Sequence, residues 1–459
     1  MISPHDSTRL TPDADQLWFV PLGGCGEIGM NMNLYGHDGH WLMVDCGITF
    51  ERTAGGETLV QMADPAFICD QRDNLCGLVI THAHEDHIGA IAYLWPQLGC
   101  PVYTTRFTAE ILQRKLREAG LTHQVPVHVV ARQCRRHIGR FDVEWVDLTH
   151  STPESQALLI RTPLGTVFHT GDWKLDPEPL IGAPYSESHY RALGDGGIRA
   201  MVCDSTNADV PGRSPSEGAL YAGLFSAVSQ AQGRVIAACF GSNIARLHTL
   251  AQVAVATKRH AGLLGRSLRS YHGAAVSADL WPDELRFIDS QHLGYLPPDE
   301  VLAIATGSQG EARAALDRLA SGQHPDLELQ PGDTVILSAR IIPGNENAVA
   351  RLLSRLRHLG LLVVVDGDIS QPLHASGHPA QDELRDMYRW VRPQIAIPVH
   401  GEPQHLQAHA ELTRNIGVPQ RLQGQNGDLF LLAPVAGVRR KAVTTGRLQL
   451  TKSGLQTIR

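Results

Sequence analysis

Short apolar segments separated by glycine-rich turns dominate the chain from residue 18 to about residue 205. Residues 17–24, 31–36 and 40–47 are three such segments in succession, and this pattern predicts a β-meander. Later apolar segments alternate with helical patterns, one of which, at 108–120, ends at Gly120. Strands and helices in this mixed order predict a layered α/β domain.

The pattern becomes regular from about residue 210. Helical periodicity and apolar strands alternate as far as residue 370, which is typical of a parallel sheet. Within this region, residues 262–270 resemble a strand and a turn, and residues 311–322 resemble a helix. The sequence therefore predicts a first domain segment at 1–209, an inserted α/β domain at 210–370, and a second domain segment at 371–459 that ends in a basic tail.

The composition is that of a soluble globular protein. The length of 459 residues suggests about two to four domains, and 43% hydrophobic residues exclude wholesale disorder. No apolar run reaches the ~18 residues that span a bilayer, and the N-terminus has no apolar region of a secretory signal. The eight cysteines form no C-x-x-C pair, which favours reduced thiols. We therefore expect a cytoplasmic protein without a membrane partner.

The charge is mildly acidic. A net charge of −7 argues against a protein that coats nucleic acid through bulk charge, but it leaves a local basic groove open. Five lysines among the 40 basic residues leave 35 arginines. The arginine guanidinium suits bidentate contact with phosphate. GC-rich codon usage is an ordinary alternative explanation for the large share of arginine among the basic residues.

The strongest chemical signal is the segment THAHEDH, from Thr81 to His87, which directly follows an apolar strand. His82 and His84 are two residues apart, so they point to the same side of an extended chain. Asp86 and His87 lie where the loop turns into a helix, so their side chains can face a second metal position. Imidazole and carboxylate groups suit Zn, Mn or Fe and not Ca. The loop therefore predicts ligands for two neighbouring metals.

One loop cannot complete two coordination spheres, so other strand ends have to supply ligands. His150, Asp172 and His400 each follow an apolar strand and precede a turn, where loops carry function. Each alone is more often an ordinary polar strand terminus. Together with the loop, they complete a set of ligands for two metals.

This set resembles the metallo-β-lactamase fold, whose metal loop has the pattern H-x-H-x-D-H. The resemblance implies an αββα sandwich, and it implies that Asp45 supports the metal loop without binding metal. It assigns His82, His84 and His150 to one divalent metal, Asp86, His87 and His400 to the other, and Asp172 to a bridge between them. Zinc fits these ligands best, while Mn or Mg could support turnover.

Longer motifs narrow the family. In order along residues 18–430, the chain resembles the ribonuclease J family of the beta-CASP group. The resemblance implies that residues 210–370 form a beta-CASP domain inserted into the metallo-β-lactamase domain. The motifs are LGGCGEIGMNM at 22–32, DSTNADVPGRSPSE at 204–217, FGSNIARL at 240–247, ATGSQGEARAAL at 305–316, LSARIIPGNENAV at 337–349, HASGHPAQDEL at 374–384 and IPVHGEPQHL at 397–406.

The same resemblance implies that Asp204 and His378 are catalytic together with Asp86. Asp204 paired with His378 is expected to relieve charge on the leaving 3′-oxygen, a kind of help typically worth ~10²–10⁴ in rate. A helix N-cap beside Ser205 and Thr206 is the ordinary alternative for Asp204.

A phosphate pocket is a further expectation. Turns of small residues expose N–H groups and hydroxyls to an anion, and in ribonuclease J-like proteins these segments grip the RNA backbone and the 5′-monophosphate. Plain turn chemistry explains the same residues equally well. The candidates are Ser242, Asn243, Ser308, Gly310, His374, Ser376 and Gly377, with Arg246 and Arg340 as weaker ones.

Single-stranded RNA binding also calls for stacking aromatics. Tyr35, Phe50, Trp173 and Tyr271 are candidates, although core packing is the ordinary fate of each. The sequence does not rank them.

Two neighbouring divalent metals suit hydrolysis of a phosphodiester. We therefore expect a metal-dependent ribonuclease acting on single-stranded RNA, as a 5′-to-3′ exonuclease with scope for endonuclease activity, in RNA processing and decay. The alternatives are a hydrolase of the same fold acting on DNA or another phosphodiester, and a non-catalytic RNA-binding scaffold. The chain is expected to be a short form that lacks the family's C-terminal domain. A homodimer formed through the catalytic core is compatible with the resemblance.

Overall fold

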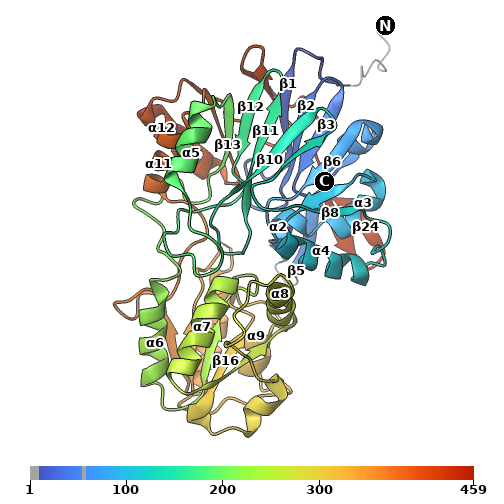
Figure 1. Ribbon diagram of the computed structural model, residues 1–459. Coiled ribbons are helices and arrows are strands. Elements are labelled where there is room, and N and C mark those ends of the chain that lie inside the picture. The colour runs from blue at the N-terminus through green and yellow to red at the C-terminus, as the bar shows by residue number, and fades with distance from the viewer. Residues whose placement is uncertain (1–9, 54–57, 343, 459) are drawn as a thin grey trace.

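The computed structural model describes residues 10–53, 58–342 and 344–458. The chain forms two parts that lie one above the other in Figure 1. The upper part contains both ends of the described chain, and the lower part is built from the middle of the sequence.

Two mixed sheets form the larger part. The eight-stranded sheet contains, in spatial order, β22 (Gly437–Arg439), β21 (Leu429–Ala433), β1 (Leu17–Gly23), β2 (Met32–His37), β3 (His40–Val44), β6 (Leu75–Val79), β7 (Val102–Thr104) and β8 (Val127–Val129). The seven-stranded sheet contains β20 (Gln420–Arg421), β19 (Ile395–Val399), β13 (Ala200–Asp204), β12 (Gly165–His169), β11 (Gln156–Thr162), β10 (Phe141–Asp147) and β9 (Arg135–Ile138). Strands β1, β2 and β3 pair antiparallel, which confirms the predicted meander.

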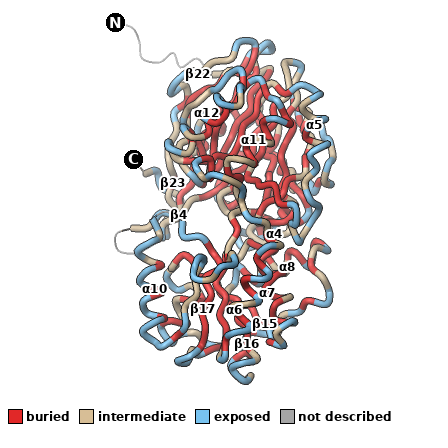
Figure 2. The backbone as a smooth tube through the Cα atoms, turned by 90° about the vertical axis from the view of Figure 1, so that its left-hand side faces the viewer, coloured by how far each residue is buried: buried red, intermediate tan, exposed pale blue. Residues whose placement is uncertain are grey.

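The two sheets face each other across a dry core. Phe19 and Leu42 of the first sheet pack in one apolar cluster with Trp145 and Ile160 of the second. The outer face of the first sheet packs against α3 (Ile91–Leu98) and α4 (Arg106–Glu118). The outer face of the second packs against α5 (Glu187–Asp195), α11 (Gln381–Val391) and α12 (Pro403–Ile416). The predicted αββα sandwich is therefore confirmed, and its buried layers are visible in Figure 2.

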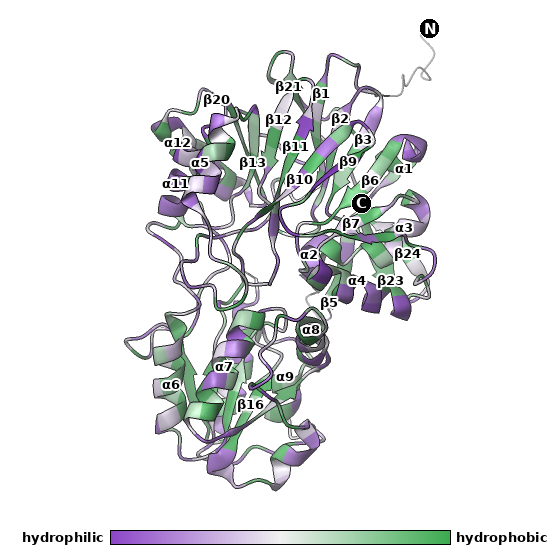
Figure 3. Ribbon diagram, in the orientation of Figure 1, coloured by the Kyte–Doolittle hydropathy of each residue, from purple (hydrophilic) through white to green (hydrophobic). Residues whose placement is uncertain are grey.

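The smaller part is a five-stranded parallel sheet. Its strands, in spatial order, are β15 (His260–Leu264), β16 (Val301–Ala305), β14 (Val235–Ala238), β17 (Thr334–Leu337) and β18 (Leu362–Val365). Its helices are α6 (Leu220–Gln230), α7 (Ile244–Ala256), α8 (Arg266–Ser277), α9 (Ala315–Ala320) and α10 (Glu346–His358), with short 3₁₀ turns at η2 (Ser290–Tyr295) and η3 (Pro298–Glu300). The strands are apolar, as Figure 3 shows, because helices cover both faces of a parallel sheet.

The register of the seven-stranded sheet explains how one part is inserted into the other. β13 and β19 are parallel neighbours, with Asp204 opposite Val399. The chain leaves this sheet after Asp204, builds the parallel sheet, and returns to the adjacent position. Residues on either side of the insert therefore meet at one sheet edge.

Three sequence expectations need correction. The strand expected within residues 262–270 is present, because residues 262–264 end β15, but the residues expected to form a turn begin α8 at Arg266. The apolar positions of α8 continue past Ser270 at helical spacing to Tyr271 and Ala274, beyond the segment considered. The helix expected at 311–322 covers only Ala315–Ala320.

The basic C-terminal stretch is not a tail but folded strands. β23 (Arg447–Thr451) pairs with β24 (Gly454–Ile458) and with β5 (Thr58–Ala63), and β4 (Ile48–Arg52) completes a four-stranded sheet. The partner strand β5 lies far away in the sequence, so no local pattern indicated this pairing. The short helices α1 (Ala66–Cys69) and α2 (Glu85–Ile88) and the turn η1 (Arg72–Asn74) complete the described elements. Among the described residues, no helix is long and apolar enough to cross a membrane.

Candidate metal centre

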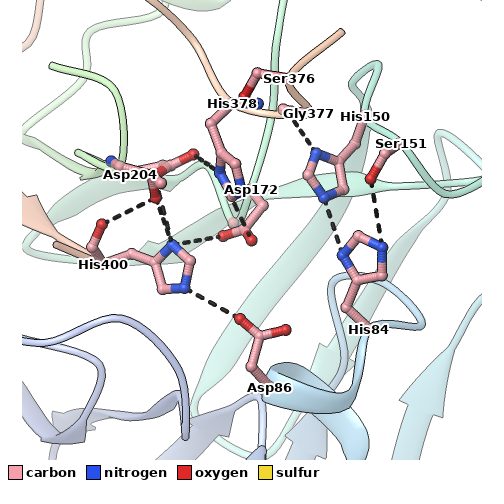
Figure 4. Close-up of polar contacts among 12 residues, drawn as sticks. His84, Asp86, His150, Ser151, Asp172, Asp204, Ser376, Gly377, His378 and His400 are labelled. Carbon is pink, nitrogen blue, oxygen red and sulfur yellow. Dashed lines mark hydrogen bonds and ion pairs between the residues drawn. The ribbon is translucent and has the colours of Figure 1, made fainter. Parts of the chain in front are cut away.

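The predicted ligands meet at the ends of neighbouring strands (Figure 4). Asp172 follows β12, and His400 follows β19. The loop after β6 brings the histidine-rich segment to the same place, and residue His150 follows β10. The insertion geometry adds Asp204, at the end of β13, and His378, from the returning segment. Strand ends of both sheets, together with the returning segment, therefore gather residues from six distant segments.

The first group consists of three imidazoles and one carboxylate. His84 Nδ1 lies 3.1 Å from both His82 Nε2 and His150 Nε2. Asp172 Oδ2 lies 3.8 Å from His82 Nε2. The four side chains each offer one ligand atom within 4.8 Å of the others. This is the set that the sequence assigned to one metal, with Asp172 beside it.

The second group shares Asp172. His87 Nε2 lies 3.2 Å from Asp172 Oδ2 and 3.5 Å from Asp86 Oδ2. His400 Nε2 lies 3.2 Å from Asp86 Oδ2, and its Nδ1 lies 3.3 Å from Asp172 Oδ1. The structure therefore brings together every predicted metal ligand, and Asp172 stands between the two groups as a bridge requires.

The other nitrogen of three rings is held by the protein. His87 Nδ1 lies 2.7 Å from Asp45 Oδ2, and His150 Nδ1 lies 2.5 Å from the carbonyl oxygen of Gly377. His82 Nδ1 lies 3.0 Å from Thr81 Oγ1. Such contacts fix the tautomer and turn the opposite nitrogen toward a metal.

Asp45 supports the loop from several sides. Its carboxylate accepts hydrogen bonds from the backbone N–H of Thr81, at 2.8 Å, and from the Thr81 hydroxyl, at 2.9 Å. The backbone of Asp45 is left-handed, with φ of 62°, and so is that of His400, with φ of 51°. Two residues other than glycine in this sparsely populated region mark a locally constrained site.

The electrostatics divide the histidines into two kinds. Burial lowers the pKa of His84 to about 4, and it lowers the pKa of His82 and His150 well below the usual range. These three rings are therefore neutral at pH 7 and offer lone pairs. Burial also acts on His87 and His400, but nearby carboxylates, above all Asp172, outweigh it and raise their pKa well above the usual range.

The carboxylates are ionised for the complementary reason. Burial alone would raise the pKa of Asp172, but the charges of His400 and His87 outweigh it and lower that pKa to about 2. The pKa of Asp86 is lowered well below its usual range in the same way, chiefly by His87. The ionised carboxylates and the neutral rings of the first group are in the states that divalent metals require. At the second group, a metal would have to take the place of the protons that the carboxylates favour on His87 and His400.

Asp204 and His378 form a pair beside Asp172. His378 Nδ1 lies 2.8 Å from Asp204 Oδ2 and 3.9 Å from Asp172 Oδ2. Burial lowers the pKa of His378, but the charge and hydrogen bond of Asp204 outweigh it and raise that pKa. Asp204 also accepts from the Thr206 N–H and hydroxyl, but a turn and not a helix follows it, so the helix N-cap considered as the alternative is wrong.

Sequence reasoning missed three polar neighbours of the cluster. Asn31 Nδ2 lies 3.1 Å from His87 Nε2, and Thr206 Oγ1 lies 3.1 Å from His400 Nδ1. Asn207 Nδ2 donates to Ser376 Oγ at 2.8 Å, which holds the segment before His378. Their only sequence signal was membership in the motifs at 22–32 and 204–217.

The phosphate candidates fall into separate places. Gly377 touches the cluster through His150, and Ser376 is tied to it through Asn207. The side chain of Asn243 instead caps α7 by accepting from the Arg246 N–H, and it donates to Glu217.

The remaining phosphate candidates line neighbouring turns. Ser308 is buried, Ser242 and Gly310 are half-buried, and His374 is half-buried with no hydrogen-bond partner on its Nδ1 among the described residues. Of the two weaker candidates, Arg246 is buried against Glu217, and Arg340 donates to Asn207 at 3.0 Å.

Only one of the four candidate aromatics is available for stacking. Tyr35, Trp173 and Tyr271 are buried, whereas Phe50 on β4 is 57% exposed. Core packing therefore accounts for three of the four candidates.

The donor set fits divalent metals. The two groups present only imidazole nitrogens and carboxylate oxygens, which suit Zn and similar transition metals. A third group combines Asp172 and His400 with Asp204 and His378. The choice of metal does not follow from this geometry.

Comparison with known proteins agrees with this arrangement. The metallo-β-lactamase superfamily matches residues 26–198, the ribonuclease J beta-CASP domain matches residues 232–356, and the RNA specificity domain of Zn-dependent metallo-hydrolases matches residues 363–422. A solved structure of a protein of unknown function from Enterococcus faecalis V583 shares the fold, with a TM-score of 0.64 at 17% identity, over 91% of this chain and 100% of that one.

Sequence relatives are much closer. Ribonuclease J of Sinorhizobium meliloti is 44% identical over 92% of this chain and 75% of its own length. Ribonuclease J of Mycolicibacterium smegmatis is 40% identical over 93% of this chain and 76% of its own length. With the fold, the insert and the ligand cluster all in agreement, the chain belongs to the ribonuclease J family of the metallo-β-lactamase superfamily.

Proposed function

We propose that this protein is a metal-dependent ribonuclease that hydrolyses phosphodiester bonds of single-stranded RNA in RNA processing and decay. The observation that carries the proposal is the complete ligand cluster, in which Asp172 lies within reach of both groups. The ribonuclease J relatives and the RNA specificity segment at 363–422 support RNA as the substrate. We further propose that each chain binds two divalent ions, preferably zinc. We also propose that the enzyme is a 5′-to-3′ exonuclease with additional endonuclease activity, as the family resemblance implies.

Two divalent ions would be held by His82, His84 and His150 and by Asp86, His87 and His400, with Asp172 between them, and they would supply an activated water and stabilise charge on the phosphate oxygens. The protein's own residues do the rest. Asp45, Thr81 and Gly377 orient the rings through their second nitrogens. Burial of the cluster keeps bulk water away and strengthens its electrostatic interactions.

Asp204 and His378 are proposed to assist the leaving group. The Asp204 carboxylate favours the protonated form of His378, since it raises the pKa of that ring. His378 is partly exposed while Asp204 is buried, so the ring can meet a substrate and the carboxylate can position it. A proton supplied to the leaving 3′-oxygen relieves the charge that develops as the bond breaks.

Ser376 and Gly377 are the phosphate candidates closest to the reaction. Both belong to the segment that carries His378, and Gly377 also contacts His150. A phosphate held by this segment would lie beside the metal groups and the proton donor at once. Ser242, Asn243, Ser308, Gly310 and His374 are proposed to extend this contact along the RNA.

The test is a cleavage time course on internally labelled single-stranded RNA with a 5′-monophosphate, run with Mn, Mg and Zn. Matching RNA with a 5′-triphosphate and matching DNA serve as controls. Mononucleotides from the first time points, released fastest from monophosphorylated RNA, are the expected result. Discrete fragments that do not depend on the 5′ end would indicate an endonuclease, and cleavage of DNA alone would replace RNA as the substrate. Failure to cleave with metals bound would contradict the proposal.

A further inference from the structure

A second candidate site lies at the edge of the parallel sheet, where β15 and β16 end. A cavity of about 520 Å³ opens there. Four arginines line it, Arg266, Arg269, Arg313 and Arg318, and its lining also includes Thr306 and one carboxylate, Asp326. Its size is that of a pocket for a small ligand. None of these residues belongs to the metal groups.

The four guanidinium groups have no acidic partner in the part of the chain that the structure describes. Arg269 donates to the carbonyl oxygen of Leu263, and Arg318 donates to that of Gln323. Neither Arg266 nor Arg313 makes a side-chain hydrogen bond or ion pair with another described residue.

Nearby carboxylates are already engaged elsewhere. Asp317, one residue before Arg318, pairs with Arg355 on α10, while Asp326 accepts from the Ser290 hydroxyl at 2.7 Å. Other arginines of the described chain do pair with carboxylates, as Arg246 does with Glu217 and Arg132 with Asp147. The pocket is therefore a local excess of positive charge on a chain with a net charge of −7.

Beside the cavity, the backbone brings the ends of β15 and β16 close together. Gly265 has φ of +145°, and a Cβ added to it would lie 2.6 Å from the Thr306 methyl and 2.7 Å from its hydroxyl. The ends of the two strands can approach this closely only because Gly265 has no side chain. In open α/β sheets, the carboxyl ends of parallel strands are where ligands bind.

We propose that this pocket binds the phosphate groups of a nucleotide. Several guanidinium groups around one cavity match a phosphate through paired N–H donors. The phosphates can come from a free nucleotide or from the RNA strand, and the second source rests on the proposed function. α8 begins at the pocket, and its Tyr271 donates to the carbonyl oxygen of Ala83 in the metal loop at 2.8 Å. One helix thus joins the two sites.

The test compares an Arg266→Gln/Arg313→Gln double variant with an Arg351→Gln/Arg357→Gln control. The control removes two exposed arginines of α10, which are likewise unpaired in the described structure. The probes are 5′-AMP and a 5′-phosphorylated single-stranded oligoadenylate, with binding measured in EDTA at several salt concentrations so that no RNA is cut. Thermal melting checks that all variants are folded.

The double variant should lose at least about tenfold in affinity for one probe, because charge-assisted contacts are removed. Loss for the oligonucleotide alone, with the slope of log K against log salt reduced by about 1.4, assigns the phosphates to the RNA strand. Loss for 5′-AMP as well assigns a free nucleotide. Unchanged affinity for both probes, or an equal loss in the control, would overturn the proposal. Because no cleavage is measured, a failure here is separate from a failure of the proposed ribonuclease activity.

Discussion

The metal centre and the arginine pocket both lie at the ends of β-strands, yet they are built in opposite ways. In the metal centre, most ligands are buried, and protein contacts fix the second nitrogens of three rings. In the pocket, Arg266, Arg269 and Arg313 are exposed, and no carboxylate pairs with any of the four guanidinium groups in the described structure. Catalysis depends on groups held rigidly before the substrate arrives. Guanidinium groups without a protein partner instead keep their hydrogen-bond donors available for a ligand. Changes in the first region should therefore alter rate and metal content, and changes in the second should alter affinity.

The largest effect is expected at Asp172, which belongs to both of the described metal groups. Asp172→Ala should abolish detectable RNA cleavage and lower the metal content, because both coordination spheres lose a ligand. Metal per chain is measured by elemental analysis and cleavage by the time course. Asp209→Ala, an exposed aspartate, is the control and should retain both properties. Full activity of Asp172→Ala would rule out the bridge.

The next effect separates proton transfer from metal binding within the same cluster. His378→Ala should slow cleavage by ~10²–10⁴ while the metals stay bound, because His378 pairs with Asp204 and is proposed to supply a proton. The exposed His358 on α10 provides a control in His358→Ala, which should change neither quantity. Loss of metal from His378→Ala would instead make His378 a ligand, as the third group of the cluster would allow.

The two regions also differ in how far the sequence could predict them. The candidate metal ligands follow apolar strands, and strand ends are visible locally, so every residue of the two groups was predicted from the sequence. The arginine pocket was not found, because its residues come from α8, the turn before α9 and the segment after it, and because the first residues of α8 were interpreted as part of a turn. Likewise, the pairing of β23 with β5 and the contact of Asn31 with His87 depend on packing between distant segments.

The buried ion pair of Glu217 and Arg246 in the insert tests how much a fixed charge pair outside the metal centre stabilises the fold. Glu217 accepts from Arg246 Nε and Nη2, each at 3.2 Å, and from Asn243 Nδ2 at 3.1 Å. Glu217→Gln would leave the charge of Arg246 buried without its partner, which costs about 3–5 kcal/mol of unfolding free energy. Denaturant unfolding measures the loss. Glu187→Gln breaks an exposed pair with Arg191 and should cost at most about 0.5 kcal/mol.

The stabilisation that Glu217 provides should also depend on pH in a definite direction. Burial raises the pKa of Glu217, but Arg246 and Lys174 outweigh it and hold that pKa below its usual value. Its stabilising contribution is therefore fully present above the unfolded pKa of about 4.3 and is lost as the pH falls through the folded pKa. The difference between the wild type and Glu217→Gln should shrink as the pH falls below about 4. A difference that stays constant would show that packing, and not charge, holds this pair.

The smallest effect is expected at Phe50, an exposed aromatic whose removal should change RNA affinity and not metal content. It lies on β4, whose Arg52 donates to the carbonyl oxygen of Gln309 in the insert at 3.0 Å, so Phe50 stands close to where the two parts meet. Stacking on one base is worth about 1–3 kcal/mol, so Phe50→Ala should weaken single-stranded RNA binding about 5–150-fold without changing metal content. Binding is measured in EDTA, beside Phe50→Tyr, which keeps an aromatic face, and Tyr295→Ala, which removes a more exposed ring from η2. Equal affinities for wild type and Phe50→Ala would rule out Phe50 as the stacking platform.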